Sequence, residues 1–95
     1  MIGNDLADTP YSFEIKPELA RKLKKFKKKD TQLFLRIQKK ILEIIEHPSH
    51  YKPLKYGMKS IRRVHIDPFV LTFTINEEEH LVEFLDFAHH DEIYL

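Results

Sequence analysis

The chain has 95 residues, of which 42% are hydrophobic and 33% charged, with no cysteine and a formal net charge of +1. This length allows one domain with a single modest core, and the composition excludes a disordered chain. The lack of cysteine excludes disulfides and thiolate metal sites and fits a reducing cytoplasm, and no apolar run approaches the roughly 20 residues of a membrane span.

The first fifteen residues predict a leader and a short strand. Residues 1–10 lack both a basic and an apolar region, so they are not a signal peptide. We expect a flexible leader there, followed by a single domain over residues 11–95. Residues 11–15 alternate between apolar and polar side chains, which predicts a strand.

Two amphipathic helices are predicted next. Pro17 suits the first turn of a lysine-rich helix, Asp30 with Thr31 can cap a second helix, and Pro48 ends it. The apolar stripes are Leu19, Leu23 and Phe26 in the first helix, and Phe34, Ile37, Ile41, Ile44 and Ile45 in the second. Because the connection between them is very short, the two helices should form an antiparallel hairpin.

Three β-prone runs follow, over residues 60–66, 69–76 and 80–87, with hairpin-length connections between them. The middle run is apolar on one face and should be a central strand. The tail, residues 88–95, is too short for a stable element of its own. The order β-α-α-β-β-β predicts an α+β fold, in which the helix hairpin packs on one face of a mainly antiparallel sheet and leaves the other face open.

Charge is distributed unevenly along the chain. All 16 lysines and arginines lie within residues 16–63, where only four acids occur, so this stretch carries +12. Residues 64–95 contain eight acids and no lysine or arginine, and residues 1–15 contain three acids. A basic half of this size indicates a polyanionic partner, which for a small protein is usually nucleic acid, although a solvated lysine-rich helix is the simpler alternative.

Alternation along residues 60–66 separates two sets of side chains. Val64 and Ile66 should face the helices, so Arg63 and His65 should point together into the open groove. We therefore favour Arg63 over Arg62 as the phosphate-binding arginine.

Two local patterns resemble a known family. Residues 62–71 read Arg-Arg-Val-His-Ile-Asp-Pro-Phe-Val-Leu, and residues 87–94 read Phe-Ala-His-His-Asp-Glu-Ile-Tyr. With the predicted element order, they resemble the RelE/ParE toxin superfamily, and within it the YafQ/RelE branch of mRNA interferases. The resemblance covers residues 51–95 well and the helices only by their order.

This resemblance implies roles for particular residues. His65 and His90 match the catalytic histidines, and Tyr94 matches the terminal aromatic residue that stacks on or positions a base. Lys52 or Lys55 falls near the loop residue beside the scissile phosphate. Arg62, His89 and the helix lysines Lys22, Lys25 and Lys28 are the further candidate RNA-binding residues.

The sequence departs from both branches of the family. It lacks the aspartate that the YafQ branch has just before the strand aromatic residue. Val70 and His90 stand where the RelE branch has arginines. An active site in this chain would therefore work with histidines.

The resemblance implies a reaction without metal or cofactor. The 2′-hydroxyl of RNA attacks its own phosphate, which needs a base, an acid and cations for the developing charge. Histidine serves as acid or base near neutral pH, and lysine and arginine supply the charge. His47 and His50 have a spacing that could hold a metal, but Pro48 interrupts the helix between them and no third ligand is evident.

The first hypothesis is thus a toxin that cuts mRNA on the ribosome and is held by a cognate antitoxin, which would wrap the basic groove with an acidic or amphipathic segment. A ParE-like inhibitor of DNA gyrase without nuclease activity is the main alternative. An inactive relative that only binds and a generic RNA-binding domain are the others.

Overall fold

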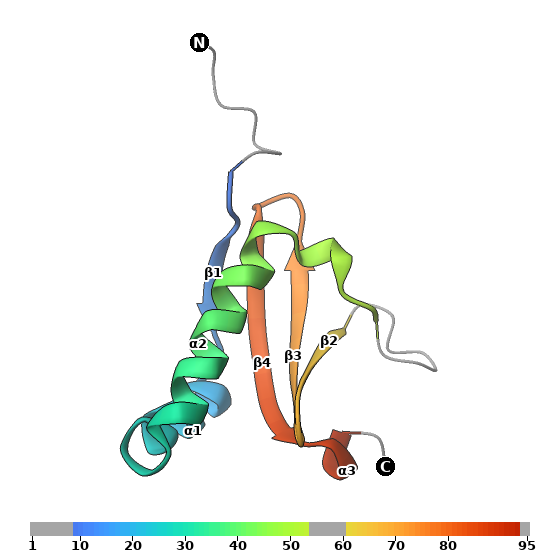
Figure 1. Cartoon of the computed structure of the whole chain (residues 1–95). Helices are drawn as coiled ribbons and strands as arrows, with labels where there is room; N and C mark the ends of the chain where they lie inside the picture. Colours follow the sequence, from blue (N-terminus) through green and yellow to red (C-terminus); the bar gives the residue numbers. More distant parts are fainter. Residues whose placement is uncertain (1–8, 54–60, 94–95) are drawn as a thin grey trace.

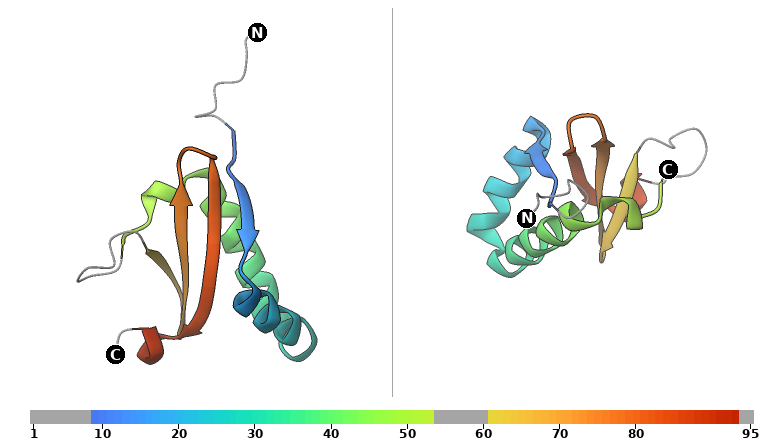
Figure 2. Two further views of the ribbon diagram at one scale, coloured as in Figure 1. Left: turned by 180° about the vertical axis from the view of Figure 1, so that it is seen from behind. Right: turned by 90° about the horizontal axis from the view of Figure 1, so that it is seen from above.

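The computed structural model describes residues 9–53 and 61–93 and confirms the predicted order of elements (Figure 1). The elements are β1 (Ser12–Ile15), α1 (Pro17–Lys29), α2 (Thr31–Glu46), the short 3-10 helix η2 (Pro48–His50), β2 (Arg62–Ile66), β3 (Phe69–Asn76), β4 (Leu81–His89) and α3 (His90–Ile93). Both long helices lie on one side of the sheet (Figure 2). Within the described ranges, no helix is long and apolar enough to cross a membrane.

Asp30 forms the whole connection between α1 and α2. Its backbone N–H donates to the carbonyl of Phe26 at 2.8 Å, and its carboxylate accepts from the N–H of Leu33 at 3.1 Å. The predicted cap is therefore confirmed, and a one-residue connection leaves the helices antiparallel. The predicted stripe of α2 needs one correction, because Leu33 is buried in the core whereas Phe34 is only half-buried.

The sheet has the order β1-β4-β3-β2. Strand β3 lies between β2 and β4 and pairs antiparallel with both, as expected for the predicted central strand. Strand β1 pairs parallel with β4, so the sheet is mixed but mainly antiparallel. Strand β2 is at the edge of this sheet, and Pro53 forms an isolated antiparallel bridge with Arg62 on its outer side.

The N-terminal strand is fixed to the β3–β4 turn by side chains. The ring of Tyr11 stacks on His80 at 3.8 Å, and its hydroxyl donates to Glu77 at 2.6 Å, a bond that raises the pKa of Tyr11. His80 has a φ of 54° and belongs to the turn, so β4 begins one residue later than predicted. Of the predicted leader, residues 1–8 lie outside the described residues, and the carbonyl of Thr9 accepts from the His80 ring at 2.9 Å.

The expectation that the tail holds no element was wrong. Strand β4 continues to His89, and α3 adds one helical turn. The N–H of His90 donates to the carbonyl of Pro68 at 3.0 Å, which attaches the start of α3 to the β2–β3 turn. A tertiary hydrogen bond thus stabilises a turn that is too short to persist alone.

The strand predicted over residues 60–66 begins at Arg62 in the structure, and Ser60 lies outside the described residues.

A β-bulge in β4 sets which of its side chains enter the core. Phe73 pairs with Phe84, but Thr72 pairs with Asp86, so one extra residue is inserted in β4. The insertion reverses the alternation of side chains beyond it. Phe84 and Phe87, which are three residues apart, consequently both pack against the helices.

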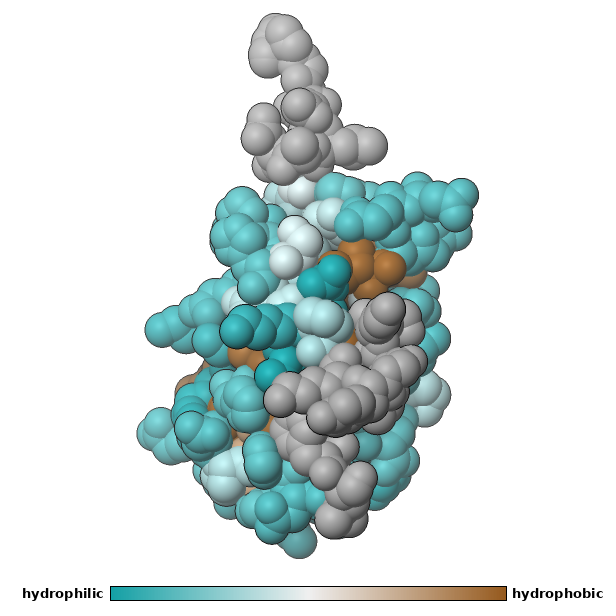
Figure 3. All heavy atoms as spheres, turned by 90° about the vertical axis from the view of Figure 1, so that its right-hand side faces the viewer, coloured by the Kyte–Doolittle hydropathy of each residue, from teal (hydrophilic) through white to brown (hydrophobic). Residues whose placement is uncertain are grey.

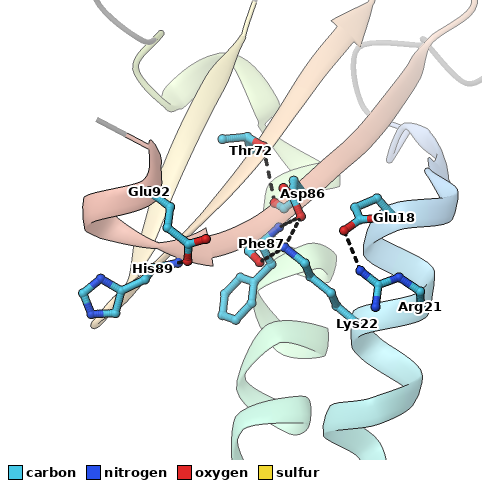
Figure 4. Close-up of polar contacts among 8 residues, drawn as sticks. All are labelled: Glu18, Arg21, Lys22, Thr72, Asp86, Phe87, His89 and Glu92. Carbon is cyan, nitrogen blue, oxygen red and sulfur yellow. Dashed lines mark hydrogen bonds and ion pairs between the residues drawn. The ribbon is translucent and has the colours of Figure 1, made fainter. Parts of the chain in front are cut away.

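Lys22 of α1 binds the bulge. Beyond Phe84 the edge of β4 is no longer paired with β1, and α1 lies beside it. The ammonium group of Lys22 donates to the Asp86 carboxylate at 2.8 Å and to the carbonyl of Phe87 at 3.0 Å (Figure 4). The same carboxylate accepts from the N–H of Phe87 at 2.8 Å. The ion pair of Lys22 with Asp86, together with its hydrogen bonds to the carbonyl and the N–H of Phe87, therefore holds the bulged part of β4.

We expect Lys22→Met to lower the free energy of unfolding by about 1–2 kcal/mol, because it leaves the partly buried Asp86 carboxylate without its cation. Urea unfolding followed by circular dichroism measures this change. Lys24→Met is the matched control, since Lys24 is exposed on the same helix. Equal stability of the two variants would contradict a role for Lys22 at the bulge.

Candidate functional site

His65 and His90 are brought together by the sheet. His65 of β2 pairs with Val70 of β3, and Val70 pairs with Ala88 of β4, two residues before His90. The two imidazole rings have centroids 5.9 Å apart and planes inclined by 28°. Both side chains are exposed. The two histidines that the sequence singled out, 25 positions apart, therefore form one accessible pair.

Arg62 and Arg63 hold the segment that follows η2. The guanidinium of Arg62 donates to the carbonyl of Tyr51 at 2.6 Å, in a partly buried position. The guanidinium of Arg63 donates to the carbonyl of Pro53 at 3.1 Å and lies 3.4 Å from that of Lys52. The N–H of Arg63 also donates to Lys52. Both arginines thus position residues 51–53 along the outer edge of β2.

Arg63 and His65 line the same hollow, as the alternation of the strand predicted. The hollow has a volume of about 330 Å³, and its other walls include His50, Tyr51 and Lys52. Val64 and Ile66 pack against the core on the side of the helices. The described surface on this side of the molecule is mainly hydrophilic (Figure 3). This hollow, at the outer edge of β2, is the outer hollow. It places an imidazole, a guanidinium and an ammonium group around one open space.

The other candidate residues are not all at this hollow. His89 lines a different hollow, between α1 and the end of β4, together with Lys22 and Lys25. Its Nδ1 accepts from the N–H of Asp91 at 3.2 Å, and its own N–H donates to Glu92 (Figure 4). Lys28 is exposed on α1. Lys55 and Tyr94 lie outside the described residues.

Sequence reasoning missed a second hollow that reaches His65 from the other side. It has a volume of about 320 Å³ and lies between α2 and the end of β2. Arg36, Lys39, Lys40 and Glu43 line it from α2. Their spacing of three, one and three residues places them on one side of the helix, beside its apolar stripe. That spacing could have identified the group, but not its position next to His65.

Among the residues that the structure describes, the histidines and carboxylates are not clustered as metal ligands would be. No group of three or more His, Asp or Glu residues in the described part of the chain is arranged to hold a metal ion. The rings of His47 and His50 stack on each other with centroids 5.0 Å apart. The outer hollow presents imidazole, guanidinium and ammonium groups, which suit proton transfer and anion binding.

An apolar groove lies on a different part of the molecule, between β1 and the helix hairpin. Its volume is about 300 Å³, and it is lined largely by aliphatic and aromatic side chains. Two of them, Phe13 and Leu42, are 42% and 55% exposed.

Comparison with known proteins gives consistent results. The family model described as "ParE toxin of type II toxin-antitoxin system, parDE" matches residues 13–94. A protein of Methanocaldococcus jannaschii named "Putative toxin RelE4" is 46% identical over 85 residues, which cover 88% of this chain and 90% of that protein.

Two solved structures share the fold at low identity. The RelBE2 toxin–antitoxin complex of Mycobacterium tuberculosis matches with a TM-score of 0.73 and 18% identity, over 85% of this chain and 92% of that chain. YafQ of E. coli matches with a TM-score of 0.60 and 16% identity, over 90% and 99% of the two chains.

Arg62→Gln should lower the free energy of unfolding by about 1–2 kcal/mol, because it removes a charged donor from the partly buried carbonyl of Tyr51. Arg36→Gln removes the same charge from an exposed helix position and should change the stability by less than about 0.5 kcal/mol. Chemical denaturation of both variants provides the measurement. A similar loss in both would mean that the charge, and not the Tyr51 bond, matters.

Proposed function

We propose that this chain, which belongs to the ParE toxin family of type II toxin–antitoxin systems, is a metal-independent endoribonuclease that cuts mRNA on the ribosome. The pairing of His65 with His90, next to Arg63 and Lys52, carries the proposal. Family membership alone does not choose between RNA cleavage and gyrase inhibition. Two imidazoles at one accessible place can supply the base and the acid that RNA cleavage needs, whereas inhibition of gyrase by binding needs no such pair.

The proposed reaction is an internal transesterification. One imidazole removes the proton of a 2′-hydroxyl, and the 2′-oxygen forms a bond to the adjacent phosphorus. The bond from phosphorus to the 5′-oxygen breaks, and the other imidazole gives that oxygen a proton. The products are a 2′,3′-cyclic phosphate and a 5′-hydroxyl, and no oxidant, reductant or water is consumed. Because the nucleophile belongs to the substrate, orientation supplies much of the acceleration.

The distance between the two rings suits one imidazole acting as the base and the other as the acid. Their centroids are 5.9 Å apart, so one phosphodiester at their exposed edges can be reached by both. Arg63 and Lys52 would then stabilise the negative charge of the phosphorane. The hydrogen bonds of Arg63 to residues 52–53 fix its position before the substrate binds.

RNA outside the cut would be held by other cations. Lys25 and Lys28 are exposed on α1, which packs against β4, whereas the outer hollow lies at the β2 edge of the sheet. We assign these lysines to docking on ribosomal RNA. Lys22 contributes less to docking because it is engaged with Asp86. Arg62 would contribute little to RNA binding because its guanidinium is bound to the carbonyl of Tyr51, and His89 would contact RNA from the hollow between α1 and the end of β4. An mRNA target places this activity in the cytoplasm.

The partner would be an antitoxin, as in the toxin–antitoxin complexes that share the fold. An acidic or amphipathic segment can cover the basic surface and block the outer hollow. The apolar groove with Phe13 and Leu42 offers a second place for such a segment.

His65→Ala and His90→Ala should each lower the rate of mRNA cleavage on programmed ribosomes by about 10² or more, because a positioned acid or base contributes about this much. Primer extension measures the cleavage. Both side chains are exposed, so the fold should persist, which circular dichroism checks. His80→Asn is the control, because it removes a histidine at the β3–β4 turn, where its ring stacks on Tyr11 and does not line the hollow.

In cells, growth arrest with cleaved mRNA should be relieved by His65→Ala. Growth arrest that persists in this variant, together with inhibition of DNA supercoiling by gyrase, would favour the ParE-like alternative. Growth arrest with neither mRNA cleavage nor inhibition of gyrase would favour a binding protein without catalysis.

Cleavage should survive an excess of EDTA when polyamines keep the ribosomes intact, because histidine catalysis needs no metal-bound water. The rate with and without chelator is compared on the same ribosomes. Loss of activity that Zn²⁺ or Mn²⁺ restores would contradict the mechanism.

A further inference from the structure

His65 stands between two hollows. The outer one contains Arg63 and Lys52, and the inner one lies between α2 and the end of β2, where Arg36 and Lys39 line it. A strand of RNA with its scissile phosphate at His65 therefore has basic side chains on both sides. Only the outer group belongs to the chemistry described above.

The charges of the inner hollow leave two cations available. Lys40 forms an ion pair with Glu43 at 3.0 Å, so these two charges offset each other. Asp67 adds one carboxylate to the rim. Arg36 and Lys39 are exposed, and among the described residues neither of them forms an ion pair. The hollow consequently retains a net positive charge.

We propose that Arg36 and Lys39 bind the backbone phosphate next to the scissile one, and so determine how the RNA strand passes His65. This inference rests on the proposed function, because it assigns a second phosphate subsite to the same substrate. The two residues are three positions apart on α2, where side chains are neighbours on the helix surface. A guanidinium and an ammonium group at that spacing can contact one phosphodiester together.

The position of the hollow favours RNA backbone over an isolated anion. One wall of it is His65 itself, so an occupant lies beside the imidazole that would act on the neighbouring phosphate. Asp67 opposes a free dianion more strongly than a phosphodiester, which carries a single charge. The lysines of α1 do not line this hollow.

The test uses a short single-stranded RNA whose 2′-hydroxyls are all methylated, so that it cannot be cut. Its affinity is measured by fluorescence anisotropy at several salt concentrations. Arg36→Gln combined with Lys39→Gln should weaken binding roughly tenfold at low salt and reduce the salt slope by about 0.7 for each lost contact. The charge-matched variant Lys24→Gln with Lys29→Gln, on α1, should bind nearly as the unchanged protein does. Arg36→Lys with Lys39→Arg should retain most of the affinity.

The outcomes separate this inference from the proposed function. Selective loss in the α2 variant supports the subsite, even if the unchanged protein fails to cut normal RNA, a result that would overturn only the nuclease proposal. Equal losses in the α1 and α2 variants, no loss in either, or no binding of the probe by the unchanged protein would overturn the subsite. Cleavage with unchanged affinity in the α2 variant would overturn it while leaving the nuclease proposal intact.

Discussion

The bulge in β4 is the constraint on which the rest of the structure depends. A regular ladder from Phe84 onward would turn Ala88 toward the helices and Phe87 away from them. The inserted residue instead buries Phe87 and places Ala88 on the side of Val70 and His65. His90 follows in α3 beside His65. Lys22, through its bonds to Asp86 and Phe87, therefore connects the packing of α1 with the position of the candidate site.

The helix-covered face of the sheet and its β2 edge have different roles. The face under the helices holds the aromatic core, in which Phe73, Phe84 and Phe87 are buried. At the β2 edge, the guanidinium groups of Arg62 and Arg63 donate to the backbone carbonyls of Tyr51 and Pro53. An edge strand offers free backbone groups, and covering them with residues 51–53 limits unwanted pairing while leaving side chains accessible. The site can thus be open without exposing the core.

The fold separates the basic residues of the chain into distinct places on the surface. Most basic residues in the described part of the chain fall into three groups: those of α1, those of the inner hollow on α2, and those of the outer hollow at β2. The acids of the C-terminal third neutralise some of them, since Asp86 engages Lys22 and Glu83 engages Lys16. The cations beside His65 are therefore a selected part of the total positive charge, and net charge alone does not identify them.

The sequence by itself determined the element order, the Asp30 cap, the central position of residues 69–76 and the helix stripes, except that Leu33 and not Phe34 enters the core from α2. Each of these follows from local periodicity or local hydrogen bonding. The sequence also indicated that Arg63 and His65 share a side. Only the tertiary structure decided that α3 forms, that β4 bulges, and that Arg36 and Lys39 approach His65. These features depend on contacts between residues far apart in the chain, such as His90 with Pro68 and Lys22 with Asp86, and no local pattern of side chains encodes them.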